Sequence, residues 1–499
     1  MKKGFVYLAG AGPGDPDLIT RKALDAMAGA DCIIYDYLAS PEIVNAYSCE
    51  KIYVGKQGSD HTLTQEEINR LIVEKANEGK TVVRLKGGDP YIFGRGGEEA
   101  EDLVKAGIPF AVIPGISSFY SAPAYAGIPL THRDYANAVE VITGHRRGDS
   151  VDEDVNFPAY DPERTYTFLM GMKNLAHIST QLIEKKNFPA DTPVAIVTWG
   201  TTPRQQVATG TLADIAARVV EIGMKPPAII VVGKVVQLRE TLRWFDTLPL
   251  FGRRIVVTRT RTQASKLSGA LRRLGADVIE FPTIIIEKMP DMSPLHDAFT
   301  RLKDFNWVVF TSQNAVQIFF EELRATGRDA RALGDIKIAA IGPATAKECE
   351  SCAIVPDLVP DEYVAEALVE AFAGENLEGQ QVLLPCSQSA RMALTDGLRR
   401  QGARVERVHI YDATLPLKID GETMVHISGA DIITFTSSST ARNFFSLVPD
   451  TDAVLACIGP VTAETVREHG YDPEIEAGTY TIDGLVESIV EYENKRLKS

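Results

Sequence analysis

The stretch Val82-Val-Arg-Leu-Lys-Gly-Gly-Asp-Pro-Tyr-Ile-Phe-Gly-Arg-Gly-Gly97 begins as an apolar strand and ends as a glycine-rich loop. Five glycines fall within the eleven residues from Gly87 to Gly97. A glycine has no Cβ, so a ligand can approach its backbone closely. Asp89 adds a carboxylate that can accept hydrogen bonds from such a ligand. A lone Gly-Gly-Asp is usually an ordinary strand-to-helix turn, but this density of glycine predicts a binding loop.

Strands alternate with helices on both sides of the loop, which predicts a mainly parallel sheet. In the first part of the chain, the pattern predicts a helix at 17–27 and strands at 5–8, 32–35, 51–56 and 110–113. Thr64-Gln-Glu-Glu67 is a capping box that predicts the start of another helix. After a linker at 148–163, further strands are predicted at 167–170, 194–197 and 228–232. We expect this second domain to end near Leu248, with Leu248-Pro-Leu-Phe-Gly252 as the linker to the rest.

Residues 252–489 contain an internal repeat. Val309-Phe-Thr-Ser312 returns as Thr434-Phe-Thr-Ser437, and Ile341-Gly-Pro-Ala-Thr345 returns as Ile458-Gly-Pro-Val-Thr462. Two copies in the same order indicate a duplication, because a solenoid needs more and shorter repeats. The sequence therefore predicts two α/β lobes whose strand ends carry hydroxyl groups toward a ligand. The hydroxyl residues at these ends are Thr311, Ser312, Thr345, Thr436, Ser437, Ser438 and Thr462.

Charge is distributed unevenly along the chain. The 499 residues are enough for three or four domains, and the net charge of −15 argues against a general nucleic-acid or anionic-membrane surface. Residues 253–273 nevertheless hold seven basic side chains and no acid. The ordinary interpretation of such a run is a solvated face. In so acidic a chain, we expect this tract to meet an anionic ligand.

The cysteines and the start of the chain bear on whether the protein is secreted or stays in a reducing compartment. Cys349-Glu-Ser-Cys352 has redox or metal spacing, but no second Cys or His pair accompanies it, so we expect no metal site. Unpaired thiols are typical of a reducing compartment. The apolar run after Met1 is too short for a signal peptide, and no run approaches membrane-spanning length. These features predict a cytoplasmic protein.

Gly10-x-Gly12 follows a predicted strand and suggests a dinucleotide fingerprint, with Asp36 in the place of the ribose acid. The third glycine would fall at position 15, which is Asp. Pro13 also removes an N–H that a pyrophosphate cradle would use. A nicotinamide-dependent dehydrogenase is therefore a minor alternative.

Asp36 and Lys56 each follow a strand of the first predicted sheet, and both can project into one crevice. The alternative is a salt bridge at the edge of the sheet. His132-Arg133 and His145-Arg146-Arg147 offer further cations near the same face. No His pair has metal spacing.

Residues 4–246 resemble uroporphyrinogen-III C-methyltransferases, of the tetrapyrrole methylase family. The matching stretches are Gly10-Ala-Gly-Pro-Gly-Asp15, Tyr35-Asp-Tyr-Leu38, Val54-Gly-Lys56, Val83-Arg-Leu-Lys-Gly-Gly-Asp-Pro90, Phe93-Gly-Arg-Gly-Gly-Glu98, Pro114-Gly-Ile-Ser-Ser118, Gly127-Ile-Pro-Leu-Thr-His-Arg-Asp-Tyr135 and Pro226-Pro-Ala-Ile-Ile-Val-Val-Gly233. The resemblance implies two α/β domains, at 1–135 and 136–248, and a homodimer formed through this half. Ser117-Ser-Phe-Tyr120 departs from the family pattern, which has smaller residues after the first hydroxyl.

The same resemblance implies S-adenosylmethionine as methyl donor. It also implies Asp36 as proton acceptor and Lys56 as proton donor. The residues that it implies for donor binding are Pro13, Gly87, Gly88, Asp89, Ile92, Ser117, Ser118, Met170, Gly200, Pro227 and Ala228.

Residues 252–495 resemble uroporphyrinogen-III synthases through the repeated motifs, Val408-His-Ile-Tyr411 and Thr479-Tyr-Thr481. The resemblance implies a two-lobed α/β module at 251–499, with one lobe at 251–287 plus 412–499 and the other at 288–411. It implies Tyr411 as a catalytic residue and places Thr345 and Thr462 in the cleft. The other residues that we expect at the substrate are Arg259, Arg261, Thr311, Ser312, Ser437 and Ser438.

Together the two resemblances predict a bifunctional α/β enzyme of tetrapyrrole biosynthesis. One half would cyclise hydroxymethylbilane to uroporphyrinogen III with ring inversion and loss of water. The other would transfer two methyl groups to that product, giving precorrin-2. Hydroxymethylbilane carries many carboxylates, and we expect the basic tract at 253–273 to bind them. The alternatives are a C-terminal half that binds tetrapyrroles without catalysis, and lobes that only sense a metabolite. The sequence leaves open whether the product leads to siroheme, cobalamin or another tetrapyrrole, and whether intermediates pass directly between the halves.

Overall fold

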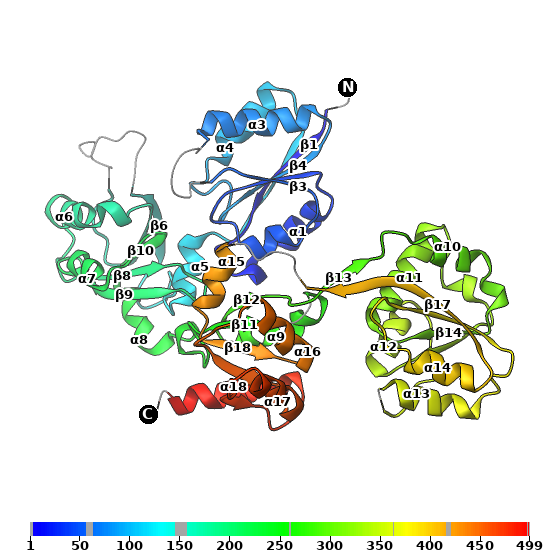
Figure 1. Cartoon of the computed structure of the whole chain (residues 1–499). Helices are drawn as coiled ribbons and strands as arrows, with labels where there is room; N and C mark the ends of the chain where they lie inside the picture. The colour runs from blue at the N-terminus through cyan, green and yellow to red at the C-terminus, as the bar shows by residue number, and fades with distance from the viewer. Residues whose placement is uncertain are drawn as a thin grey trace. The chain divides into compact units, whose positions relative to one another are not determined.

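The computed structural model describes residues 3–55, 63–144, 157–258, 261–362, 364–415, 421–496 and 498. Within these ranges the strands form four sheets of five strands each, and helices flank every sheet (Figure 1). Contacts divide the chain into two compact units. Unit 1 comprises Met1–Ile255, Gly269–Val278 and Ile489–Ser499, and unit 2 comprises Val256–Ser268 and Ile279–Ser488. The domain limits expected from the sequence stay a prediction.

The first sheet has the order β3-β2-β4-β1-β5, and its paired strands are all parallel. Its members are β1 (Phe5–Gly10), β2 (Cys32–Tyr35), β3 (Glu50–Tyr53), β4 (Thr81–Lys86) and β5 (Phe110–Ile113). The central strand β4 comes from the opening stretch. Val82, Val83 and Leu85 are fully buried, as in a parallel strand covered on both faces. This confirms the strand expected there.

Four α-helices connect these strands: α1 (Arg21–Ala28), α2 (Pro41–Asn45), α3 (Gln65–Asn77) and α4 (Gly96–Lys105). A further helix, α5 (Ser118–Tyr125), follows β5. The expected capping box is present, because the Thr64 hydroxyl accepts from the Glu67 N–H and the Glu67 carboxylate accepts from the Thr64 N–H. The helix expected at 17–27 begins later. Pro16–Leu18 is a single 3-10 turn, and Thr20 then caps α1 by accepting the Ala23 N–H.

The second sheet has the order β6-β7-β10-β8-β9. Its strands are β6 (Ala138–Thr143), β7 (Arg164–Leu169), β8 (Pro193–Thr198), β9 (Gln206–Thr211) and β10 (Ala228–Val232). Only the pair β6–β7 is parallel, and the other pairs are antiparallel. The mainly parallel arrangement expected for the first sheet is confirmed there and does not extend to this second sheet. The sequence pattern missed β9 because its Gln-Val-Ala-Thr-Gly-Thr run is polar, which suits an edge strand. The helices α6 (Leu175–Lys186) and α7 (Ile215–Ile222) contribute to the core of this sheet.

The third sheet, β12-β11-β18-β19-β20, is built from two separate parts of the chain. Its strands are β11 (Arg254–Val257), β12 (Asp277–Glu280), β18 (Ile432–Phe435), β19 (Val454–Cys457) and β20 (Ile475–Glu476). Between β12 and β18 the chain forms the fourth sheet, β13-β17-β16-β14-β15. That sheet comprises β13 (Ile285–Lys288), β14 (Trp307–Phe310), β15 (Lys337–Ala340), β16 (Gln381–Ser387) and β17 (Arg404–Thr414).

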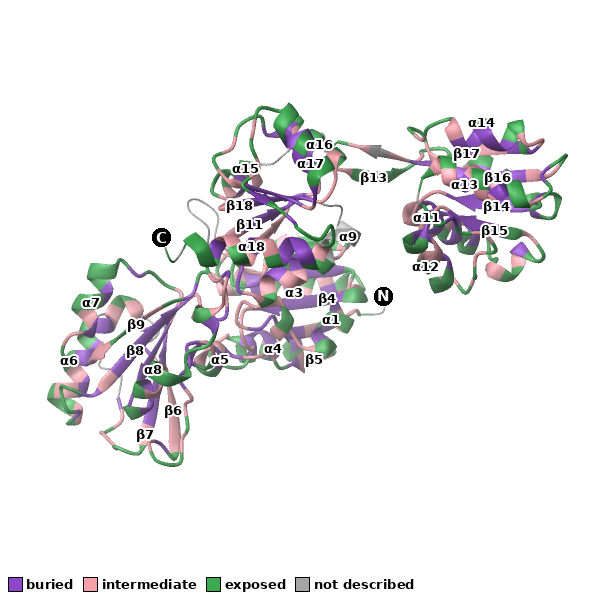
Figure 2. Cartoon of the chain, turned by 90° about the horizontal axis from the view of Figure 1, so that it is seen from below, coloured by how far each residue is buried: buried purple, intermediate pink, exposed green. Residues whose placement is uncertain are grey.

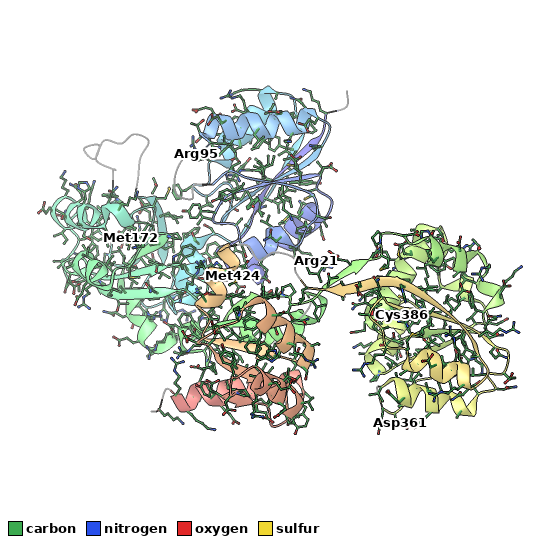
Figure 3. All side chains as sticks on the ribbon, in the orientation of Figure 1. Arg21, Arg95, Met172, Asp361, Cys386 and Met424 are labelled. Atoms are coloured by element: carbon green, nitrogen blue, oxygen red, sulfur yellow. The ribbon has the colours of Figure 1, made fainter. Side chains whose placement is uncertain are left out.

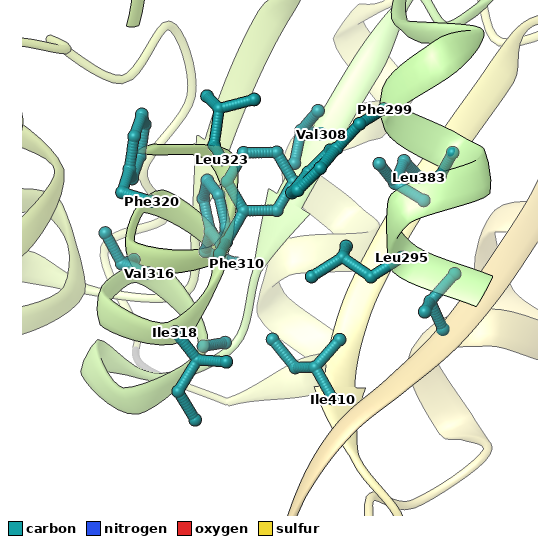
Figure 4. Close-up of a cluster of buried hydrophobic side chains, with 14 of the residues drawn as sticks. Leu295, Phe299, Val308, Phe310, Val316, Ile318, Phe320, Leu323, Leu383 and Ile410 are labelled. Carbon is teal, nitrogen blue, oxygen red and sulfur yellow. The ribbon is translucent and has the colours of Figure 1, made fainter. Parts of the chain in front are cut away.

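The helices of these two sheets are α9 (Arg261–Arg273), α10 (Ser293–Thr300), α11 (Gln313–Ala325), α12 (Pro343–Ser351), α13 (Ala365–Ala371), α14 (Ala393–Arg400), α15 (Gly421–Ser428), α16 (Ser438–Leu447), α17 (Pro460–Glu468) and α18 (Ile482–Arg496). Buried residues concentrate on the strands, and exposed residues on the outer faces of helices (Figure 2). Phe299, Phe310 and Phe320 lie in the core between the fourth sheet and its helices (Figure 4). Replacing one such phenylalanine by alanine costs about 3–5 kcal/mol.

The repeated motifs have the same backbone geometry in both copies. Ser312 (φ −164°, ψ 157°) and Ser437 (φ −166°, ψ 159°) are the N-caps of α11 and α16. Gly342 and Gly459 hold the same extended conformation before α12 and α17. The duplication predicted from sequence therefore appears as two matching strand-to-helix turns.

The segment expected to be a linker, Leu248 to Gly252, is packed. Leu250 is fully buried and donates its N–H to the carbonyl of Leu274 at 2.9 Å. The ring of Phe251 lies 5.3 Å from that of Phe245. The predicted linker thus packs against neighbouring residues through Leu250 and Phe251, and its place as a domain boundary stays a prediction.

Candidate functional site

Three glycines meet where β1, β4 and β5 end. A Cβ on Gly10 would lie 2.5 Å from both the Gly88 carbonyl oxygen and the Gly115 Cα. A Cβ on Gly115 would overlap the same Gly88 oxygen. The carboxyl ends of parallel strands share one edge of the sheet, which is where ligands bind in open α/β folds. Only glycine allows the three loops to come this close.

Gly88 combines a left-handed backbone with a position at which a Cβ would not be crowded. Its φ is +68°, and a Cβ there would make only ordinary contacts, the nearest at 3.8 Å to the Ser117 Cα. The Gly88 N–H donates to the Gly12 carbonyl at 2.7 Å, which fixes the loop. Gly87 is different, because its Cβ would overlap the side chain of Leu38. Gly87 is thus required by packing, whereas Gly88 leaves room for a ligand.

Asp89 ties two of these loops together. One carboxylate oxygen accepts the Tyr91 N–H at 2.7 Å, and the other accepts the Gly115 N–H at 2.9 Å. A carboxylate oxygen has a further lone pair after accepting one bond. The side chain therefore shapes the loop and still has capacity to accept from a ligand.

The loop after β8 lies against the first sheet's loops. The Asp15 N–H donates to the Thr201 hydroxyl at 3.2 Å, and a Cβ on Gly200 would overlap that of Ala122 on α5. The Trp199 N–H donates to the Pro227 carbonyl at 3.2 Å, so Pro227 and Ala228 flank the same loop. The structure thus brings together the loops of Pro13, of Gly87 to Asp89 and of Gly200.

Backbone strain gathers in the same loops. Among the described residues, seven other than glycine have positive φ. Five of them lie in loops named by the methylase resemblance: Phe93, Arg95, Met170, Trp199 and Thr201. Such conformations cluster at ligand-binding sites because the surrounding structure must hold them. Arg95, the N-cap of α4, is labelled in Figure 3.

The remaining donor-site candidates are placed as follows. Ser117 is buried and precedes α5, and Ser118 begins that helix. Ile92 and Met170 are exposed. Their part in binding stays a prediction.

Asp36 is held at both carboxylate oxygens. The Leu38 N–H donates to one oxygen at 3.2 Å, and Arg84 Nη2 lies 3.3 Å from the other. The cation beside Asp36 is therefore Arg84, whereas the Asp36–Lys56 salt bridge that the sequence offered as an alternative stays a prediction. Lys56 and the His145-Arg146-Arg147 run lie outside the described residues.

Sequence reasoning missed three buried charged residues near Asp36. Arg84 and Lys86 lie on β4, and both contact Glu99 on α4. Burial, followed by the neighbouring Arg84 charge, lowers the pKa of Lys86. The available signal was the presence of two basic residues inside an otherwise apolar strand.

Tyr411 and Ser312 come together in the fourth sheet. Their hydroxyl oxygens are 2.8 Å apart, and Ser312 also accepts the Ala315 N–H at 3.1 Å as the cap of α11. Tyr411 is buried, and burial raises its pKa, against the opposing hydrogen bond with Ser312. Cys386 lies in this same sheet (Figure 3), where Arg407 Nε donates to its sulfur at 3.2 Å.

The other expected synthase hydroxyls have local partners or are buried. Ser437 forms a capping box with Thr440, and the Ser438 hydroxyl donates to the Val461 carbonyl at 3.1 Å, beside Thr462. Thr345 and Thr462 are buried in the first turns of α12 and α17, and Thr311 is half-buried at the end of β14. Their role toward a substrate stays a prediction.

Much of the basic tract is neutralised by acids from elsewhere in the chain. The ion pairs are Arg253–Glu493 at 2.8 Å, Arg254–Asp277 at 3.3 Å, Lys266–Asp483 at 3.5 Å and Arg272–Glu42 at 3.0 Å. Arg259 and the side chain of Arg261 lie outside the described residues. A local charge count could not show these pairs, because the acids are distant in sequence.

The described part of the chain lacks both a membrane-spanning helix and a metal-binding cluster. No helix there combines the length and apolar character needed to cross a membrane. No group of three or more His, Cys, Asp or Glu side chains there has an arrangement that could hold a metal ion.

Two family models match different parts of this chain. Residues 6–216 match the model described as Tetrapyrrole (Corrin/Porphyrin) Methylases, and residues 265–487 match that of Uroporphyrinogen-III synthase HemD. Porphyrin biosynthesis protein HemD of Ruminiclostridium josui is 37% identical over 501 residues, covering 98% of each chain. Uroporphyrinogen-III C-methyltransferase of Bacillus subtilis is 41% identical over 76% of this chain and 78% of that relative. A solved uroporphyrin-III C-methyltransferase of Thermus thermophilus is 38% identical, covering 49% of this chain and 98% of its own, with a TM-score of 0.42.

Proposed function

The chain belongs to a family of porphyrin-biosynthesis proteins that combine a tetrapyrrole methylase with a uroporphyrinogen-III synthase, and we propose that it catalyses two consecutive steps. The synthase half closes hydroxymethylbilane to uroporphyrinogen III. The methylase half transfers two methyl groups to that product, giving precorrin-2. The observation that carries the methylase assignment is the meeting of Gly10, Gly88 and Gly115 at the strand ends, with Gly88 the one of the three that is not crowded.

S-adenosylmethionine, when bound, supplies a methyl group on a positively charged sulfur. The residues proposed to hold it come from the segments that follow β1, β4, β5, β7 and β8 and from the start of β10. They are Pro13, Gly87, Gly88, Asp89, Ile92, Ser117, Ser118, Met170, Gly200, Pro227 and Ala228. Gly88 fits this role because its missing Cβ leaves space at the strand ends. Holding two reactants in line contributes most to such a transfer, since an electron-rich pyrrole carbon needs no strong base to attack.

Asp36 is proposed to accept the proton that the tetrapyrrole loses, from a position other than the methylated carbon, once the methyl group has been transferred. Lys56 is proposed as the proton donor, as the family resemblance implies. A carboxylate positioned at hydrogen-bond reach is sufficient for this step. Both oxygens of Asp36 already have a partner, so the side chain is fixed in orientation. This arrangement supports a role that needs a defined direction for proton transfer.

In the synthase half, Tyr411 is proposed to assist the departure of the hydroxyl group from hydroxymethylbilane. A tyrosine phenol is protonated at neutral pH, and burial raises the pKa of Tyr411 further, so it can donate a hydrogen bond. Arg259, Arg261, Thr311, Ser312, Thr345, Ser437, Ser438 and Thr462 are proposed to hold the substrate in its folded shape. The alternative is a C-terminal half that binds tetrapyrroles without turnover.

One incubation tests both steps. The full-length protein is given hydroxymethylbilane and labelled S-adenosylmethionine, and the product spectrum and incorporated label are followed. We expect labelled precorrin-2. Label transfer only when uroporphyrinogen III is supplied would limit the activity to the methylase half. Binding without turnover of either substrate would indicate a sensor, and reduction of a nicotinamide cofactor would favour the dehydrogenase.

We also propose a cytoplasmic location and a homodimer formed through the methylase half. The described cysteines are free thiols, which suits a reducing compartment. The dimer rests on the family resemblance alone. Sedimentation equilibrium of the full-length protein measures it, and a single species of monomer mass at micromolar concentration would contradict it.

A further inference from the structure

Four charged side chains form a continuous buried path that ends at Asp36. Asp36 pairs with Arg84 at 3.3 Å, Arg84 Nε lies 3.2 Å from Glu99 Oε1, and Lys86 Nζ lies 2.8 Å from the same oxygen. The side chains of Arg84, Lys86 and Glu99 are 3%, 5% and 0% exposed, whereas that of Asp36 is 23% exposed. Only the end at Asp36 therefore reaches the surface of the site.

The partners of Arg84 fix its direction. Nη1 donates to the carbonyls of Leu85 at 3.0 Å and Ile34 at 3.4 Å, and Nε donates to Glu99. Nη2 is then the group directed at Asp36. Because a guanidinium is planar and rigid, fixing two of its nitrogens also fixes the third.

Burying these four charged side chains has a cost in folding free energy that stability alone does not explain. Burying charges carries a desolvation penalty that ion pairing often fails to recover, and apolar residues of similar volume can be equally stable there. The Oε2 atom of Glu99 is buried with no hydrogen-bond partner among the described residues. The two cations, Arg84 and Lys86, outnumber the buried carboxylate of Glu99, and the charges balance only when Asp36 is included. Stability alone is therefore a weak reason for this arrangement.

We propose that Arg84 is a positioning residue for Asp36 in methyl transfer, and that Glu99 and Lys86 hold Arg84 in place. This inference rests on the proposed role of Asp36 as proton acceptor. The Leu38 N–H and Arg84 each occupy one lone pair of Asp36 and prevent the carboxylate from turning. The remaining lone pairs are then presented to the substrate in one orientation. Without Arg84 the carboxylate turns away for part of the time, and turnover falls.

The test is a double-mutant cycle in the full-length protein, with supplied uroporphyrinogen III and labelled S-adenosylmethionine. We expect Arg84→Gln to lower kcat by about 10-fold or more, with unchanged affinity for S-adenosylhomocysteine by calorimetry. If Arg84 acts through Asp36, the double variant Arg84→Gln/Asp36→Asn is no slower than Asp36→Asn alone. Arg84→Lys, which keeps the charge, should recover part of the rate.

Two further variants separate positioning from general damage. Glu99→Gln keeps the shape of the side chain but removes the charge that holds Arg84, so its kcat should fall and should also be non-additive with Asp36→Asn. If Arg84→Gln does not fold, the Glu99→Gln variant still tests the proposal. The matched control is Arg239→Gln, which breaks the partly buried Arg239–Asp246 ion pair of the same half and should leave kcat unchanged.

The outcomes also distinguish this inference from the proposed function. Multiplicative losses in the cycle would overturn positioning while leaving Asp36 as the proton acceptor. A near wild-type rate for Asp36→Asn would remove both. An equal fall in kcat for Arg239→Gln would show that Arg84 matters only for the fold.

Discussion

The hydroxyl of Ser312 lies 2.8 Å from that of Tyr411, which joins the turn after β14 to the strand β17. Ser312 also caps α11 through the Ala315 N–H. One serine therefore serves a helix and a buried phenol at once. Separate substitutions of Tyr411 and Ser312 can distinguish the role of the phenol in catalysis from the role of the serine in capping α11.

Tyr411→Phe removes the phenol oxygen and keeps the ring packed in its core. We expect slower cyclisation of hydroxymethylbilane with unchanged methylation of supplied uroporphyrinogen III, because the methylase site is elsewhere. Ser312→Ala, unlike Tyr411→Phe, should lower stability by about 0.5–2 kcal/mol, the usual value for a lost N-cap, in addition to any loss of substrate binding. Separate assays of the two steps and denaturant unfolding measure these effects. An unaltered cyclisation rate in Tyr411→Phe would leave the tyrosine with a structural role only.

Gly88→Val places a branched side chain at the strand ends, where the methyl donor is proposed to bind. We expect loss of S-adenosylhomocysteine binding by calorimetry. The positive φ of +68° adds backbone strain, of about 1–3 kcal/mol. Gly223→Val is the matched control, since Gly223 has φ +74° and no atom near its missing Cβ. It should show the strain without the loss of affinity, and retained binding in Gly88→Val would exclude Gly88 from the donor site.

Asp36→Asn keeps the size of the side chain and removes the proton acceptor. We expect normal affinity for S-adenosylhomocysteine and methyl transfer slower by about 100-fold, within the usual range for general-base catalysis. Stopped assays with labelled donor give the rate. Loss of donor affinity equal to the loss of rate would instead assign Asp36 to binding.

The ion pairs of Glu322 should make the free energy of unfolding depend on pH in the acid range. Hydrogen bonds from Lys288 and then His296 lower the pKa of its carboxyl group, and Lys288 Nζ lies 2.8 Å from one carboxylate oxygen. A lowered folded pKa means that this stabilisation is present above the ordinary Glu value, about 4.3, and is lost as pH falls through the folded pKa. Glu322→Gln should therefore be less stable than wild type at neutral pH and approach it in acid. A difference in unfolding free energy that is constant from neutral pH to acid would contradict this.

Dividing the chain at the packed junction tests whether the halves work alone. We expect residues 1–248 to methylate supplied uroporphyrinogen III and residues 251–499 to cyclise hydroxymethylbilane, since no motif crosses the cut. The first piece lacks Leu250 and the contact of Phe251 with Phe245, so its melting temperature should fall below that of a piece ending at Gly252. If either folded piece is inactive until the other is added, the halves share a site.

Local signals in the sequence determined many of the elements. The predicted strands Cys32–Tyr35, Phe110–Ile113 and Ala228–Val232 have the observed bounds, because each is a short apolar run between turn residues. The capping box at Thr64 was also readable, since its bonds join residues three apart. Asp36 and the glycine loop were likewise visible, as both follow strands at the edge where α/β proteins bind ligands.

The tertiary structure decided which of these residues meet. Arg84 pairs with Asp36, 48 positions away, because β2 and β4 are neighbours in the first sheet. Gly10, Gly88 and Gly115 touch because β4 and β5 lie on either side of β1. In the basic tract, Arg253 pairs with Glu493 of α18 and Arg272 pairs with Glu42 of α2, so the charges that look unpaired in the sequence have partners in the fold. Such contacts depend on the order of strands and the packing of helices, which no local run of sequence contains.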